Sequence, residues 1–161
     1  MIYAIIVIIY GLFFLMCYLG TGTTAKNMKS FYSYPDIIQE KIRTNDKLSG
    51  MIPKKSSYLA SFISNYVLFT VVFFVVGLLL RIDGFWNNLW YFLIMGIGLN
   101  LFDFFVIDML WWCNTKRIRF EELDADAEEY KNPKKHFMAF VRAIPVFICV
   151  AVTVSILMNF F

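Results

Sequence analysis

Four long apolar stretches restrict the fold of this chain more than any other feature. They cover residues 2–20, 58–80, 86–113 and 137–161. An α-helix rises about 1.5 Å per residue, so about twenty apolar residues cross the roughly 30 Å hydrocarbon layer of a bilayer. Lipid offers backbone polar groups no partner, whereas a helix satisfies them internally. The sequence therefore predicts an all-α integral membrane protein with four transmembrane helices.

The composition favours the same fold class. Hydrophobic residues make up 60% of the 161 positions, aromatic residues 19%, and the mean hydropathy is +0.63. In soluble domains the apolar share is about half at most. Little sequence is left for a separate soluble domain, so we expect residues 1–161 to form a single membrane domain. The first stretch has no basic n-region and no A-x-A site, so we expect it to be a retained helix.

The basic residues are confined to two long loops, residues 21–57 and 114–136, apart from Arg81 and Arg142. Cytoplasmic loops of membrane proteins are enriched in Lys and Arg. This distribution predicts that both loops are cytoplasmic and that both termini lie outside. The net charge of +3 is then a topology signal, and no nucleic-acid partner is expected.

The three cysteines, Cys17, Cys113 and Cys149, all lie within the apolar stretches. No C-x-x-C pair and no Cys/His spacing accompanies them. We therefore expect no disulfide, no metal site and no cofactor.

Within the third apolar stretch, residues 99–113 form an apolar run that three polar residues interrupt, Asn100, Asp103 and Asp108. Asp108 and Arg142 each lie five residues from the cytoplasmic end of their helix, about 7 to 8 Å inside it. Opposite charges at equal depth on consecutive helices predict an ion pair. Asp103 lies about 7.5 Å deeper, and no cation is expected at that depth. In an α-helix the two carboxylates are about 140° apart, so they are not expected to share a proton.

The charged and amide groups gather in the cytoplasmic half of the predicted bundle. Asn100, Asp103 and Trp111 fall on one stripe of an α-helix, and Asn65 lies at a similar depth in the second stretch. The predicted binding site comprises Asn65, Asn100, Asp103, Asp108, Trp111 and Arg142. Two structural alternatives stay open: Asp108 and Arg142 as a purely structural pair, and Trp111 as part of the interfacial aromatic belt.

The sequence also predicts the structure of one loop segment and the environment of one loop histidine. Residues 34–43, "YPDIIQEKIR", predict a short amphipathic helix on the inner membrane surface. His136 follows Lys134 and Lys135, and we expect it to be solvated, with a role as acid or base as the alternative.

The stretch "NLFDFFVIDMLWWCNTKRIR", together with "EEYKNPKKHFMAF", carries a resemblance. Read as N-x-x-D-x-x-x-I-D-x-x-W before a basic loop, it resembles a family of small uncharacterised four-helix bacterial membrane proteins. The resemblance covers residues 99–140. It implies four spans in the bacterial cytoplasmic membrane, and it implies no activity.

Three functions fit a polar site that faces the cytoplasmic leaflet. The first is a binding or accessory protein for a cation, a lipid headgroup or a small amphiphile. The second is a membrane-embedded enzyme for a lipid-like substrate, with Asp103 or His136 as acid or base and Arg142 holding an anionic headgroup. The third is a small oligomeric ion-coupled transporter that uses Asp103. Whether the chain is an enzyme stays open, and the expected partners are membrane lipids and further copies of the chain.

Overall fold

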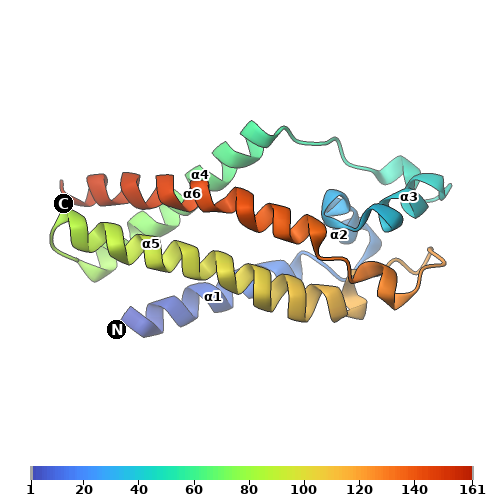
Figure 1. Ribbon diagram of the computed structural model, residues 1–161, viewed down its shortest axis with the longest axis horizontal. Helices are drawn as coiled ribbons and strands as arrows, with labels where there is room; N and C mark the ends of the chain where they lie inside the picture. Colours follow the sequence, from blue (N-terminus) through green and yellow to red (C-terminus); the bar gives the residue numbers. More distant parts are fainter. Residues whose placement is uncertain (1, 161) are drawn as a thin grey trace. The chain divides into compact units, whose positions relative to one another are not determined.

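The computed structural model describes residues 2–160, and of residues 2 and 3 the backbone alone. All regular structure in this range is helical, which confirms the all-α class (Figure 1). The long helices are α1 (Ile2–Leu19), α4 (Tyr58–Leu80), α5 (Phe85–Phe102) and α6 (Lys134–Met158). Two shorter α-helices, a π-helix and 3₁₀ turns connect them: α2 (Thr24–Lys29), α3 (Asp36–Thr44), π-helix η3 (Asp103–Trp111), and the turns η1 (Phe31–Ser33), η2 (Ser49–Met51), η4 (Trp112–Asn114), η5 (Lys116–Ile118) and η6 (Ala127–Tyr130).

Three of the described helical runs are long and apolar enough to cross a membrane. They are Tyr58–Leu80, Phe85–Asn114 and Ala127–Met158, whereas Ala4–Leu19 is a shorter apolar helix. Large apolar side chains along α4, such as Val71, are left exposed. An apolar surface of this kind is suited to lipid rather than water. Three of the four expected apolar helices are thus confirmed as long enough to span a membrane. A span by residues 2–20 and the orientation in the membrane stay predictions.

Local chemistry sets both ends of α4. The Ser57 hydroxyl accepts a hydrogen bond from the Ala60 amide at 3.1 Å, which caps the first turn. At the other end Arg81 adopts a left-handed conformation with φ 49°, and its N–H donates to the Gly77 carbonyl at 2.9 Å. This bond satisfies a carbonyl that the helix itself leaves free.

The chain divides into two compact units. Unit 1 contains the chain up to Tyr10, residues Ser56–Phe102 and the chain from Phe140 onward, and unit 2 contains Gly11–Lys55 and Asp103–Ala139. The single membrane domain expected for residues 1–161 stays a prediction. The two predicted loops belong to one unit, unit 2, except for Ser56 and Ser57 at the end of the first loop.

Aromatic packing and a close helix approach hold unit 1 together. The ring of Phe73 lies 5.8 Å from that of Phe92 on α5 and 6.2 Å from that of Phe147 on α6, between ring centroids. All three side chains are buried. A Cβ atom at Gly96 would lie 2.8 Å from Cδ1 of Phe147, so a side chain at this position would separate α5 from α6.

Unit 2 has a hydrophobic core of its own. Its buried members are Met28, Phe31, Tyr34, Ile38, Ile42, Leu48, Trp112, Ile118, Phe120 and Tyr130. The short helix expected within residues 34–43 is confirmed as α3, which begins at Asp36 and ends at Thr44. Ile38 and Ile42 of α3 are fully buried in this core, whereas Ile37 is exposed. The expected position of this helix on the inner membrane surface stays a prediction.

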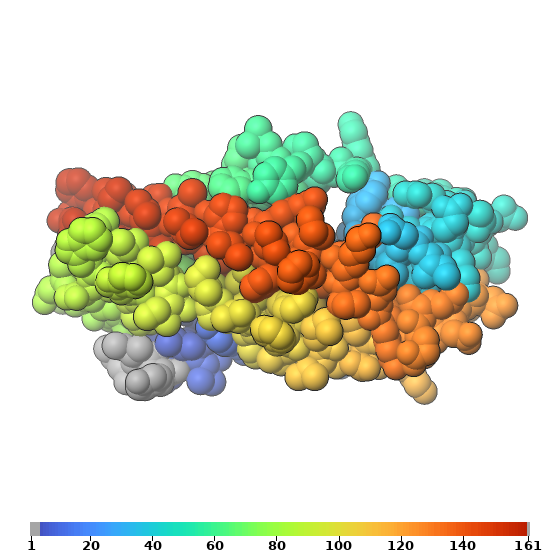
Figure 2. Space-filling view, in the orientation of Figure 1, coloured from blue at the N-terminus to red at the C-terminus, as the bar shows by residue number. Residues whose placement is uncertain are grey.

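Polar contacts join the two loop segments of unit 2. The Tyr34 hydroxyl donates to the Ile118 carbonyl at 2.7 Å, and the Asn27 amide donates to the Arg117 carbonyl at 3.1 Å. In Figure 2 the surface of α3 meets that of the segment 116–132. Burial, followed by the nearby Tyr130, raises the pKa of the Tyr34 hydroxyl far above its ordinary value, so it stays a donor.

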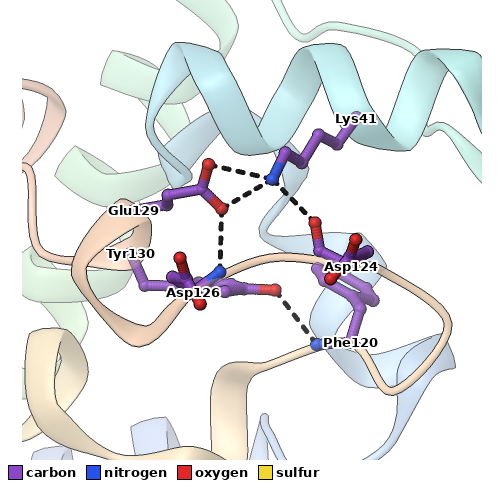
Figure 3. A network of polar contacts seen from close by, with 6 residues as sticks. All are labelled: Lys41, Phe120, Asp124, Asp126, Glu129 and Tyr130. Carbon is purple, nitrogen blue, oxygen red and sulfur yellow. Dashed lines mark hydrogen bonds and ion pairs between the residues drawn. The ribbon is translucent and has the colours of Figure 1, made fainter.

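Lys41 lies at the centre of the network in Figure 3. Its Nζ atom is 2.7 Å from Glu129 Oε2 and donates to the Asp124 carbonyl at 2.7 Å. Glu129 also accepts from the Asp126 amide at 2.9 Å, which completes a capping box. The hydrogen bond to Glu129 raises the pKa of Lys41. Helix α3 is thereby tied to the acidic part of the second loop.

Candidate functional site

The third apolar stretch changes its helical geometry where its carboxylates begin. Helix α5 is followed without a break by the π-helix η3, which starts at Asp103. A π-helix bonds residue i to residue i+5, so i+5 lies nearly above i, as i+4 does in an α-helix. Asp103 and Asp108 stand in this relation. The expected separation of about 140° is therefore wrong, because it assumed α-helical geometry.

Asp108 is paired with His136, a partner that the depth of the residues in the sequence did not predict. The Nδ1 atom of His136 lies 2.8 Å from Asp108 Oδ1, and the Asp108 side chain is 15% exposed. Asp108 lies on η3 and His136 in the first turn of α6, and both belong to unit 2. Arg142 belongs to unit 1, so the expected ion pair between Asp108 and Arg142 stays a prediction.

His136 is buried, contrary to the expectation of a solvated residue. It is 6% exposed, and its ring lies 5.7 Å from the ring of Trp112, edge to face at 62°. Trp112 is 7% exposed. Among the described residues, neither His136 Nε2 nor Trp112 Nε1 has a hydrogen-bond partner. Unpaired buried polar atoms cost free energy unless a ligand or water satisfies them, so these two atoms mark a candidate site.

Asp103 lies within electrostatic reach of this pair. It interacts with Asp108 and with His136, and Cys17 of α1 interacts with both carboxylates. Within residues 2–160 the Asp103 carboxylate has no hydrogen bond and no ion pair of its own. The candidate site therefore consists of Asp103, Asp108, His136 and Trp112, all within unit 2.

Three of the other predicted site residues belong to unit 1. The Asn100 amide donates to the Phe140 carbonyl at 3.1 Å within unit 1, which makes it an interhelical hydrogen bond between α5 and α6. Asn65 is exposed on α4. Arg142 is also exposed, with its guanidinium 5.8 Å from the ring centroid of Tyr58. These three residues belong to unit 1, whereas Asp108 and His136 belong to unit 2.

Trp111 contributes to the packing of α1 against η3. Its ring lies 5.4 Å from that of Phe14 and 6.2 Å from that of Tyr18, within unit 2. Its neighbour Trp112, which the expected stripe omits, is the tryptophan that contacts His136. The π-helix shifts the register of the stripe after Asp103, so a pattern read as α-helical does not include Trp112.

The described residues contain no group of three His, Cys, Asp or Glu side chains arranged to hold a metal ion. The site can instead accept hydrogen bonds through its carboxylates and donate one through the Trp112 indole. Comparison with known proteins adds no functional assignment, because no family model, no curated protein and no solved structure matches the chain.

Proposed function

We propose that the chain is a multi-pass protein of the bacterial cytoplasmic membrane with four spans and both termini outside. The three long apolar helical runs support the spans. The basic residues of the two loops support the orientation, because Lys and Arg favour the cytoplasmic side. In this topology unit 2 contains residues 21–55 of the first cytoplasmic loop and all of the second.

Single cysteines test this topology. In a variant with Cys17, Cys113 and Cys149 replaced by Ser, we place one cysteine at the exposed Asp46 or at the exposed Asp83. A membrane-impermeant maleimide is expected to label Asp83→Cys in right-side-out vesicles and Asp46→Cys only in inverted vesicles. The reverse pattern would overturn the orientation.

We infer that the protein binds a cationic group, a lipid headgroup or a small amphiphile at the cytoplasmic half of its third span. The observation that carries this function is Asp103, a carboxylate in an apolar helix with no hydrogen-bond or ion-pair partner among the described residues. A charge in such a place is costly and is typical of functional sites in membrane proteins. The neighbouring Asp108–His136 pair supplies further polar atoms.

Native mass spectrometry of protein extracted in mild detergent tests this function. Wild-type protein is expected to retain a bound lipid or amphiphile, and Asp103→Asn is expected to release it. Asp46→Asn, at an exposed turn in the same unit, is the matched control and should retain the ligand. Equal retention by all three proteins would contradict a binding role for Asp103. The same spectra report whether the chain forms a homo-oligomer.

One observation favours an enzyme as the second candidate function. An imidazole held by a carboxylate through Nδ1 has the arrangement of a general base, with Nε2 left to take a proton. Water activated in this way could attack a lipid ester. Turnover of phospholipid in mixed micelles that is lost in His136→Phe would support this function, and no turnover above the empty-micelle rate would exclude it for that substrate.

A further inference from the structure

The atoms left without partners around His136 determine what kind of ligand they can bind. Asp108 accepts the proton on Nδ1, and this bond selects the tautomer in which Nε2 carries the lone pair. Nε2 is then an acceptor, as are the carboxylate oxygens of Asp103 and Asp108. His136 is more than nine-tenths buried, and its Nε2 has no partner among the described residues. A ligand with several hydrogen-bond donors would satisfy these acceptors.

A positively charged donor fits best. Two carboxylates lie within electrostatic reach of each other, so a cation is favoured over a neutral alcohol. Among the described residues no group of three His, Cys, Asp or Glu side chains is arranged to hold a metal ion, and a nitrogen cation fits the acceptors. An ammonium group offers three N–H donors in a small volume, and charge-assisted hydrogen bonds to carboxylates are the strong ones.

Trp112 adds a requirement for an acceptor on the same ligand. Its buried Nε1–H is a donor without a partner, and its ring lies 5.7 Å from the ring of His136. An oxygen acceptor a few atoms from the ammonium group would satisfy this indole. An ethanolamine phosphate headgroup has both features: a primary ammonium and phosphate oxygens two carbons away.

We propose that Asp103, Asp108, His136 and Trp112 bind the primary ammonium of an ethanolamine phosphate group, with the carboxylates and Nε2 accepting from it. This inference rests on the proposed function, because it names the ligand class of the same site. The shared chemistry occurs in phosphatidylethanolamine and in free phosphoethanolamine. A ligand inside the predicted third span favours the lipid, whose chains occupy the same layer.

Lipids that differ only at the headgroup test the proposal. Wild-type protein in detergent is titrated with dioctanoyl phosphatidylethanolamine, phosphatidylcholine and phosphatidylglycerol, and binding is followed by tryptophan fluorescence. Choline keeps the charge and the phosphate but has no N–H donor. We expect phosphatidylethanolamine to bind about tenfold or more tightly than phosphatidylcholine, because three charge-assisted hydrogen bonds are lost with choline. Free phosphoethanolamine should bind more weakly than the lipid, and tighter binding of the free form would assign the site to a soluble ligand.

Variants separate this inference from the proposed function. Asp103→Asn and His136→Phe are expected to reduce the preference for phosphatidylethanolamine to about onefold, and Asp46→Asn should leave it unchanged. Equal wild-type affinity for phosphatidylethanolamine and phosphatidylcholine would overturn the ammonium inference, while loss of both lipids in Asp103→Asn would still uphold the proposed function. No binding of any of the three lipids would overturn both. If a variant fails to fold by circular dichroism, the wild-type comparison of the two lipids decides.

Discussion

The Nδ1 atom of His136 lies 2.8 Å from Oδ1 of Asp108, so the first turn of α6 is bound to the π-helix η3. Asp108→Ala is expected to lower the free energy of unfolding by about 1–3 kcal/mol, because it leaves the buried imidazole without its partner. Asp108→Asn keeps an acceptor oxygen and should cost less. Thermal unfolding in detergent measures both, and equal losses would show that the hydrogen bond itself contributes little.

Gly22 is a position in unit 2 where a side chain would not fit. Its φ is 100°, and a Cβ atom there would lie 2.7 Å from the guanidinium carbon of Arg117. That guanidinium stacks 3.9 Å from the Tyr18 ring and donates to the Thr21 carbonyl at 3.2 Å. Gly22→Ala should therefore destabilise the protein by more than about 1 kcal/mol, through backbone strain and displacement of Arg117.

Gly50 provides the matched control for this substitution. It lies in the turn η2 of the same unit, and a Cβ atom there would meet nothing within 4 Å. Gly50→Ala is expected to change the free energy of unfolding by less than about 0.5 kcal/mol. Similar chemical-denaturation midpoints for the two variants would contradict the assignment of strain to Gly22.

The buried hydrogen bond between the Tyr34 hydroxyl and the Ile118 carbonyl can be tested directly. The hydroxyl donates to this carbonyl at 2.7 Å from a fully buried side chain. Tyr34→Phe keeps the ring but leaves that carbonyl unpaired, which should cost about 1–3 kcal/mol. Tyr58→Phe, at an exposed ring on α4, should be close to neutral. A loss of stability confined to the control would refute the role of this bond.

Acid should weaken the link between Asp36 and Lys135, whose charged atoms lie 2.6 Å apart within unit 2. The hydrogen bond from Lys135, and then its charge, hold the pKa of Asp36 below its ordinary value. A carboxyl whose pKa is lowered on folding contributes stability above its unfolded pKa of about 3.9, and this is lost as pH falls through the lower folded value. The stability difference between wild type and Asp36→Asn should therefore be constant above about pH 5 and shrink below about pH 4.

Thermal unfolding of both proteins between pH 3 and pH 7 measures this difference. Asp46→Asn serves as the control, because Asp46 is an exposed acid in the turn after α3. An equal pH trend in the two variants would show that Lys135 does not set the acid response of Asp36.

The helices themselves could be predicted because their signals are local. Runs of about twenty apolar residues, with Ser57 before Tyr58 and basic loops between, predict helices whatever the rest of the chain does. The structure confirms three such helices. The costly carboxylate at Asp103 could also be recognised from its apolar neighbours, because depth along a helix follows from residue count alone.

The partner of Asp108 depended on rotation about the helix axis, which residue count does not give. The π-helix from Asp103 to Trp111 alters that rotation, so Asp103 and Asp108 lie on nearly the same face of the helix. The tryptophan that contacts His136 is Trp112. No residue pattern in this stretch distinguishes it from an α-helix. The chosen partner, His136, is more than twenty residues away in sequence and is placed by the start of α6.

By itself, the sequence determined which segments are helical and apolar, because those properties depend on neighbours within a few residues. Only the tertiary structure decided that Ile38 and Ile42 pack with Ile118 and Tyr130 in the core of unit 2, and that His136 is buried against Asp108. Both outcomes join segments far apart in the chain. Such contacts arise from the packing of whole helices and loops. A local sequence pattern does not indicate which element a given segment packs against.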